Sequence, residues 1–252
     1  MSFKPATVIG SPVSPYVRKV LAVCEIKAVP YRIDPIVPFF GGDGFSEISP
    51  LRRIPVFVDD AVSLCDSTVI CEYLEERYPA PRVLPSGLAD RARARWIEEF
   101  SDTRIGDIFI WRIFYEAVIL PFVFQRTRDK AKIARAVAEQ MPGVVDYLEK
   151  IAPGDGFLFG ELSIADLAVA IPFSNLEWAR VRPDASRWPK TCAWVERTQA
   201  VPALAKVTQI AAKLMQTPPS AQRSALIELG VPLTDATIAT ETPRRSLMLD
   251  SV

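Results

Sequence analysis

The sequence predicts an α/β domain of element order β-α-β-β-β-α, followed by a second domain built of helices alone. Short apolar runs alternate with helix-period segments only in the first part of the chain. From Asp90 onward no strand-type alternation occurs, and the stretch before it is rich in proline, which favours a linker. Near Gln216 the composition turns to Pro, Ser and Thr. We therefore expect a first domain, a linker, a helical domain and a partly ordered C-terminal extension at residues 1–80, 81–89, 90–215 and 216–252.

The first domain opens with a strand and a helix. Ala6–Ile9 is a short apolar run that ends at Gly10, which predicts a strand. Beyond Pro15, apolar residues recur at positions i, i+3, i+4 and i+7 of one helix face. These residues are Val17, Val20, Leu21 and Cys24. Tyr31 and Ile33 alternate with polar neighbours and predict the second strand.

A loop, a β-hairpin and a helix complete the first domain. Prolines and glycines interrupt the segment 35–50, so we expect a loop there with at most one broken turn. Val56–Val58 predicts a strand, and an acidic turn joins it to a partner strand at residues 62–64. Apolar spacing at residues 69–74 predicts a helix, which must stop before Pro79 because the residue preceding a proline disfavours helical geometry.

Apolar spacing of helical period recurs through the second domain. It marks the segments 92–100, 133–137, 144–148, 167–171 and 188–200. Ser163 and Asp166 form a capping-box variant before one of these helices, and we assign them stability alone. In the extension, residues 225–229 predict a short helix. Because a disordered tail rarely keeps apolar runs such as Leu247-Met248-Leu249, we expect at least residues 220–229 to be ordered against the helical domain.

The composition excludes several classes of function. The chain of 252 residues has 30 basic and 30 acidic side chains, and this zero net charge does not favour nucleic-acid binding. No apolar run approaches the length of a membrane span, and no secretory signal is visible. The absence of histidine removes Ser-His and Cys-His catalysis and the commonest metal ligand. Four cysteines without a CxxC pair indicate reduced thiols in a cytoplasmic protein, with no metal site.

Four short segments in a fixed order carry a family resemblance. They read GSPVSPYVR from Gly10, RRIPVFVDD from Arg52, LCDST from Leu64 and LSIADL from Leu162. With the thioredoxin-like element order of the first domain, they resemble the cytosolic glutathione transferases. Within that family they resemble the bacterial serine type, with some likeness to the ether-cleaving β-etherases. The resemblance implies that glutathione is the co-substrate and that the protein is a homodimer. The sequence departs from the family pattern at Arg52-Arg53, at the loop Phe39–Gly42 and throughout the extension.

Ser14 is the residue that the resemblance assigns to the sulfur of glutathione. It precedes Pro15 at a helix start, where unpaired N–H groups and the helix dipole favour an anion. Lowering a thiol pKa by about two units requires roughly 2.7 kcal/mol. One hydrogen bond to a charged group supplies about 1.5–3 kcal/mol, so a hydroxyl suffices without histidine. Ordinary helix capping by Ser14 stays open, and Ser11 is the alternative ligand of the sulfur.

Two further segments match the family's contacts to the rest of the tripeptide. Ile54-Pro55 resembles its cis-proline, so that Ile54 would offer backbone N–H and C=O groups to the cysteinyl unit and Arg53 would face the glycine carboxylate. A trans Pro55 that opens an edge strand is the other interpretation. Asp66 and Ser67 match the family's acidic-Ser pair, which holds the γ-glutamyl ammonium and carboxylate at a helix N-terminus. Helix capping by the same pair is compatible with this role.

Five aromatic residues are the candidates for the pocket that binds the second substrate. The resemblance assigns the electrophile pocket to Tyr16, Phe109, Trp111, Phe114 and Tyr115. Four of these cluster on a long helix of the second domain. Core packing or a dimer contact is an equally open role for each of them.

The predicted function is conjugation of the glutathione thiolate to a small hydrophobic electrophile, aided by proximity and a dry apolar pocket. The rival is a non-catalytic binding or scaffolding protein of the same fold. Retention on immobilised glutathione, followed by an assay with an aryl halide, separates the two. A glutathione-dependent isomerase is disfavoured, since it predicts a serine- and cysteine-rich turn and no cysteine lies between residues 1 and 23.

Overall fold

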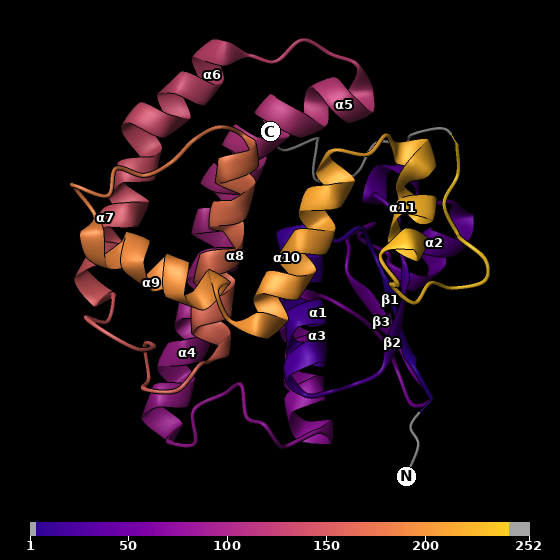
Figure 1. Ribbon diagram of the computed structural model, residues 1–252, viewed down its shortest axis with the longest axis horizontal. Coiled ribbons are helices and arrows are strands. Elements are labelled where there is room, and N and C mark those ends of the chain that lie inside the picture. Colours follow the sequence, from indigo (N-terminus) through magenta and orange to yellow (C-terminus); the bar gives the residue numbers. More distant parts are fainter. Residues whose placement is uncertain (1–3, 242–252) are drawn as a thin grey trace. The chain divides into compact units, whose positions relative to one another are not determined.

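The computed structural model describes residues 4–241 and consists of two compact units, each described here by itself (Figure 1). Of the described residues, the thioredoxin-like unit contains 4–81 together with 205–241. The helical unit is Arg82–Leu204. This division differs by one helix from the boundary that we expected at residue 215, because α10 (Pro202–Met215) falls mostly in the thioredoxin-like unit.

The thioredoxin-like unit is built on a four-stranded sheet of order β2-β1-β3-β4. Its strands are β1 (Ala6–Ile9), β2 (Tyr31–Asp34), β3 (Val56–Val58) and β4 (Ser63–Cys65). β1 and β2 are parallel and are joined by the crossover helix α1 (Pro15–Ile26), whereas the other two pairings are antiparallel. Helix α3 (Ser67–Arg77) follows β4 and packs against α1. The predicted fold class is therefore confirmed.

The segment 35–50 is more regular than the sequence predicted. It contains a 3-10 turn, η1 (Pro38–Phe40), and a helix, α2 (Asp43–Ile48). The expectation of a loop was wrong because α2 is stabilised by contacts far away in the sequence. Its Phe45 is fully buried in a cluster with Ile9, Ile36 and Val56, which supplies the free energy that local propensity lacks.

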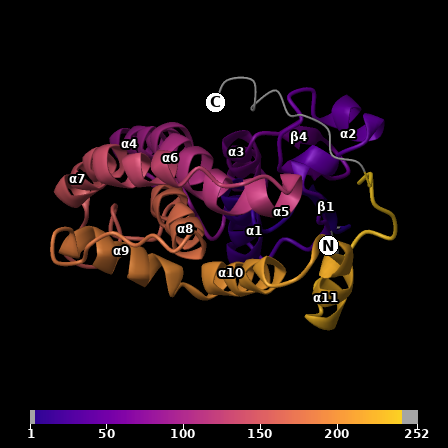
Figure 2. The same ribbon diagram turned by 90° about the horizontal axis from the view of Figure 1, so that it is seen from above.

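The helical unit contains helices only, as predicted, apart from isolated bridges near Phe157. Its helices are α4 (Leu88–Phe100), η2 (Ser101–Ile119, of π type), α5 (Leu120–Phe124), α6 (Lys130–Arg135), η3 (Ala136–Gln140), α7 (Met141–Ile151), α8 (Ile164–Trp178) and α9 (Pro189–Gln199). Helix α8 is buried along almost its whole length and lies between α4 and α9 (Figure 2). The predicted capping box of Ser163 and Asp166 is present at its start.

The C-terminal extension packs on the thioredoxin-like unit, which corrects our expectation that it lies against the helical domain. After the 3-10 turn η4 (Pro219–Ala221) it forms helix α11 (Gln222–Glu228), which overlaps the short helix predicted at residues 225–229. Leu226 on this helix is fully buried. The chain then follows β2 and the loop near Phe40, where Figure 1 shows it in yellow beside the sheet. The apolar run Leu247-Met248-Leu249 lies outside the described residues.

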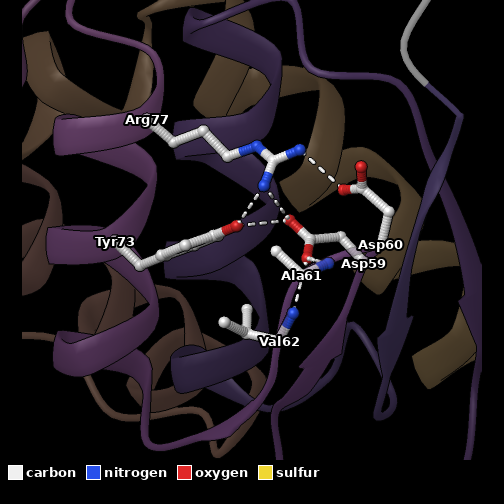
Figure 3. A network of polar contacts seen from close by, with 6 residues as sticks. All are labelled: Asp59, Asp60, Ala61, Val62, Tyr73 and Arg77. Atoms are coloured by element: carbon white, nitrogen blue, oxygen red, sulfur yellow. Dashed lines mark hydrogen bonds and ion pairs between the residues drawn. The ribbon is translucent and has the colours of Figure 1, made fainter.

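A polar network fixes the β3–β4 hairpin to α3 (Figure 3). The carboxylate of Asp59 accepts hydrogen bonds from the backbone N–H of Ala61 at 2.8 Å and of Val62 at 3.0 Å, and from the Tyr73 hydroxyl at 2.7 Å. Arg77 lies 3.5 Å from the same carboxylate. Burial alone would raise the pKa of Asp59, but the hydrogen bonds that it accepts and the nearby guanidinium together hold that pKa below its ordinary value.

We expect Asp59→Asn to flatten part of the acid dependence of stability. Because the folded-state pKa is lowered, the carboxylate stabilises the fold above its unfolded pKa of about 3.9, and this contribution is lost as the pH falls through the folded value. Thermal melts of both proteins between neutral and acid pH measure the difference. Asp60→Asn is the control, since that side chain is 64% exposed. If the melting temperatures of Asp59→Asn and of the parent protein fall equally with pH across the acid range, the assignment is contradicted.

Candidate functional site

The register of the sheet brings three of the predicted segments to one edge. Ile9, at the end of β1, pairs with Val56, at the start of β3, and Val56 pairs with Cys65, at the end of β4. Gly10, Pro55 and Asp66 are the next residues beyond these positions. The turn before α1, the Ile54-Pro55 segment and the start of α3 therefore lie together in the thioredoxin-like unit.

Ser14 lies in the turn before α1, at this edge of the sheet. It is the N-cap of α1 with extended backbone angles, Pro15 is the first helical residue, and the hydroxyl accepts the N–H of Val17 at 3.5 Å. The side chain is half-buried. Ser11, the alternative, is 3% exposed, and its hydroxyl accepts the N–H of Val13 at 3.4 Å. Exposure therefore favours Ser14, although its role stays a prediction.

Gly10 sets the close approach of the turn to Ile54. Its φ is +144°, a conformation that residues with a Cβ rarely adopt. A Cβ at this position would lie 2.6 Å from Cγ2 of Val17 and 2.9 Å from Cβ of Ile54. The absence of a side chain therefore lets α1 and the Ile54-Pro55 segment come together.

The Ile54-Pro55 peptide bond is cis, as the resemblance implied. Pro55 is buried and Ile54 is half-buried. The two preceding arginines differ in their contacts. Arg52 donates hydrogen bonds to the carbonyl of Gly41 at 2.7 Å and to a serine of α2, so it ties down the neighbouring loop. Arg53 is exposed, which leaves its guanidinium accessible to an anion, as the predicted contact to the glycine carboxylate requires.

The start of α3 is a second helix N-terminus at the same edge. Asp66 is the N-cap, with φ +77°, and its Oδ1 accepts the N–H groups of Thr68 at 2.9 Å and Val69 at 3.3 Å. Ser67 is the first helical residue and is 4% exposed. The expected capping role is therefore present in the fold, and binding by the same pair stays a prediction.

Comparison with known proteins identifies the family. The family model for the glutathione S-transferase N-terminal domain matches residues 8–82, and the model for the C-terminal domain matches residues 115–209. Together these matches cover more than half of the chain. The chain belongs to the glutathione S-transferase family.

Relatives of this transferase chain are similar over most of their length. A protein of Solanum tuberosum named "Probable glutathione S-transferase" is 25% identical over 197 residues, which cover 74% of this chain and 82% of the relative. Glutathione S-transferase theta-3 of Mus musculus is 27% identical over 189 residues, covering 73% and 77%. The solved glutathione S-transferase of Rhodospirillum rubrum F11 matches the fold with a TM-score of 0.74 at 23% identity, covering 80% of this chain and 91% of its own.

The aromatic candidates on η2 of this transferase have packing roles in the helical unit. Phe109 is fully buried and meets the ring of Phe173 edge-on, with centroids 5.2 Å apart. Phe114 is 3% exposed and lies beside Trp178. Trp111 and Tyr115 contact each other with centroids 5.9 Å apart, and Trp111 is half-buried. Core packing thus accounts for Phe109 and Phe114. An electrophile pocket that includes these four rings and Tyr16, which is half-buried on α1, stays a prediction.

Two buried cations on α1 were missed by the sequence analysis. Lys19 is 2% exposed, and its Nζ donates to the Thr68 hydroxyl at 3.3 Å on the first turn of α3. Arg18 is fully buried, and burial lowers its pKa to about 9, so it remains a cation at neutral pH. Both add positive charge to the unit that carries the two helix N-termini. Two consecutive basic residues inside an apolar helix were the available signal.

Metal-binding and membrane-spanning features were also sought. Among residues 4–241, no group of three or more Cys, Asp or Glu side chains is arranged to hold a metal ion. In the same part of the chain, no helix combines the length and the hydropathy that crossing a membrane requires.

Proposed function

We propose that this glutathione S-transferase conjugates the glutathione thiolate to a small hydrophobic electrophile, with Ser14 holding the sulfur. The observation that supports it most is the meeting of two helix N-termini, at Ser14 and Asp66, with the cis Ile54-Pro55 segment at one sheet edge. Glutathione carries carboxylates, a peptide backbone and a thiol. Helix N-termini favour anions, and an exposed strand-like backbone favours a peptide.

The proposed role of Ser14 is to donate a hydrogen bond from its hydroxyl group to the thiolate sulfur of glutathione. A hydrogen bond to a charged acceptor is worth about 1.5–3 kcal/mol, and the dipole of α1 adds to it. The thiol proton leaves to solvent, and the thiolate then attacks an electrophilic carbon. A carbon–sulfur bond forms while the bond to the leaving group breaks, and the leaving group departs with the electron pair of that bond.

The two ends of the tripeptide would be held by charge. Arg53 is exposed and takes the glycine carboxylate. The N–H groups of the first turn of α3 and the Ser67 hydroxyl take the γ-glutamyl carboxylate, whereas Asp66 takes the ammonium group. The backbone of Ile54 takes the cysteinyl unit as an added strand would.

Asp66→Asn should raise the KM for glutathione with little change in kcat. The asparagine oxygen still accepts the N–H groups of Thr68 and Val69, so the helix cap persists, while the charge that holds the ammonium group is lost. Losing one charged hydrogen bond of about 1.5–3 kcal/mol predicts a KM increase of about tenfold or more. Initial rates over a glutathione series measure it.

Ser67→Ala should act in the same direction by removing a hydroxyl from the γ-glutamyl carboxylate. Melting temperatures of both variants show whether the fold is intact. A fall in kcat with an unchanged KM would contradict the assignment, because neither side chain is proposed to touch the sulfur.

A binding assay and a turnover assay separate the enzyme from the rival scaffolding protein. We expect the protein to be retained on immobilised glutathione and to conjugate a generic aryl halide. Retention without turnover would favour the scaffold.

The substrate class, the oligomeric state and the location complete the proposal. A panel of aryl ethers tests the likeness of the Ser-Pro-Tyr-Val turn to the β-etherases. The proposal includes a homodimer, the commonest soluble oligomer. It also includes the cytoplasm, where glutathione keeps thiols such as the four free cysteines of the described chain reduced.

A further inference from the structure

The C-terminal extension adds a strand-like segment to the edge of the sheet. β2 is an edge strand, and an exposed edge leaves backbone groups unpaired. The N–H of Ile33 donates to the carbonyl of Pro232 at 2.9 Å, and the N–H of Thr234 donates to the carbonyl of Ile33 at 3.1 Å. This parallel bridge, at Ile33 and Leu233, ties residues some 200 positions apart to one another.

A second contact joins the extension to the loop before α2. The N–H of Gly42 donates to the carbonyl of Ile238 at 3.1 Å, and the N–H of Thr240 donates to the carbonyl of Phe40 at 2.6 Å. A Cβ on Gly42 would lie 3.0 Å from Cγ2 of Thr240, so the glycine permits this close approach. The side chain of Ile238 packs on the same apolar cluster as Ile54.

The side chain of Asp34, at the end of β2, is the buried anchor of the extension. Asp34 is 3% exposed. Its Oδ2 accepts the N–H of Ile238 at 2.9 Å, and its Oδ1 lies 3.7 Å from Nη1 of Arg223 on α11. Nη2 of the same guanidinium donates to the carbonyl of Thr234. A buried carboxylate needs such partners, because removing one of them leaves an uncompensated charge.

The backbone of Asp34 leads from this anchor to the Ser14 turn. Its carbonyl accepts the N–H of Gly10 at 2.8 Å and the N–H of Ile36 at 2.8 Å. The carbonyl of Ile36 accepts the N–H of Ser11 at 2.7 Å, and the carbonyl of Ser11 accepts the N–H of Ser14 at 3.0 Å. These hydrogen bonds, connected through the covalent backbone of Asp34, Ile36 and Ser11, link the extension to the N-cap of α1.

We propose that Arg223 and the backbone of Ile238, acting through Asp34, are positioning groups for the turn that carries Ser14. The extension would then support the proposed glutathione site through the turn, not as a ligand of glutathione. This inference rests on the proposed function for its chemical meaning, but the mechanical link between extension and turn can be tested without any ligand.

Amide hydrogen exchange on the full chain tests the link, with Arg223→Gln compared against Arg32→Gln. Both substitutions remove an arginine–aspartate pair between β2 and the extension. However, the pair of Arg32 with Asp235 is 3.8 Å apart, and these side chains are 48% and 99% exposed. We expect the exchange rate of the peptide 8–17 to rise about tenfold in Arg223→Gln, because the buried Asp34 carboxylate loses a charged partner. The exchange rate should stay unchanged in Arg32→Gln.

The outcomes of the exchange experiment are distinct. Arg223→Lys, which keeps the positive charge, should restore part of the protection and also serves if Arg223→Gln folds poorly. Unchanged exchange at the turn in Arg223→Gln would overturn the inference. So would an equal rise throughout the thioredoxin-like unit, because that pattern indicates general loosening rather than positioning.

A second readout links the turn to the chemistry. Thiolate absorbance of bound glutathione against pH gives the pKa of its thiol, and we expect Arg223→Gln to raise that pKa and lower kcat more than it raises KM. If the parent protein does not lower the thiol pKa at all, the proposed function fails, while the exchange experiment still decides the positioning inference. If the parent lowers it and Arg223→Gln leaves it unchanged, the positioning inference fails alone.

Discussion

Replacing Ser14 with alanine is expected to lower kcat/KM for glutathione conjugation by about 10- to 100-fold, the loss that corresponds to one hydrogen bond to a charged group. The hydroxyl is proposed to hold the thiolate at the N-terminus of α1, where the side chain is half-buried and accepts the N–H of Val17. The pKa of the bound thiol should rise in parallel, since the charged form loses its donor. Steady-state rates and thiolate absorbance against pH measure both effects.

Ser11→Ala is the matched control for this prediction, because it makes the same substitution at the other serine of the same turn. Its side chain is buried and accepts the N–H of Val13, so we expect a much smaller kinetic effect. Loss of the helix cap in Ser14→Ala should reduce the free energy of unfolding by only about 1 kcal/mol. The reverse ranking of the two variants would move the sulfur site to Ser11, and full activity in both would exclude activation by a hydroxyl.

The largest effect on stability is expected from Asp166→Ala in the helical unit. This carboxylate is fully buried and serves four donors at once. Oδ2 accepts the N–H and the hydroxyl of Ser163 at 2.9 and 2.7 Å, while Oδ1 accepts the N–H of Leu158 at 2.9 Å and the indole N–H of Trp194 at 2.7 Å. Each buried donor left without a partner costs about 1–3 kcal/mol, so for four donors at the low end of that range we expect a loss of about 4 kcal/mol or more in the free energy of unfolding.

Asp129→Ala is the control for this second prediction. Asp129 is also an aspartate N-cap, but it accepts a single N–H, that of Lys132 at 2.9 Å, in an exposed position. Removing it should cost about 1 kcal/mol. Denaturant or thermal unfolding of the two variants measures the loss in the free energy of unfolding for a buried carboxylate with four donors and for an exposed helix cap. Equal losses would show that Asp166 contributes no more than a cap, contrary to its four hydrogen bonds.

Local patterns were sufficient wherever a residue's role depends on its sequence neighbours. The four strands, α1, α3 and the capping box at Ser163 follow from apolar period and capping residues, and the structure contains each of them. The N-cap positions of Ser14 and Asp66 also follow locally, because a polar side chain next to a helix start satisfies the first unpaired N–H groups. By itself the sequence thus determined the fold class, the capping residues and the segments proposed to bind glutathione.

Only the tertiary structure decided the features that depend on distant partners. Helix α2 forms inside a segment rich in proline and glycine because Phe45 is buried by Ile9 and Val56. The extension lies on the thioredoxin-like unit because β2 offers an open edge and Asp34 a buried charge, neither of which is visible from the composition of a Pro-, Ser- and Thr-rich tail. Such contacts join residues up to 204 positions apart, and burial, not local propensity, supplies their free energy.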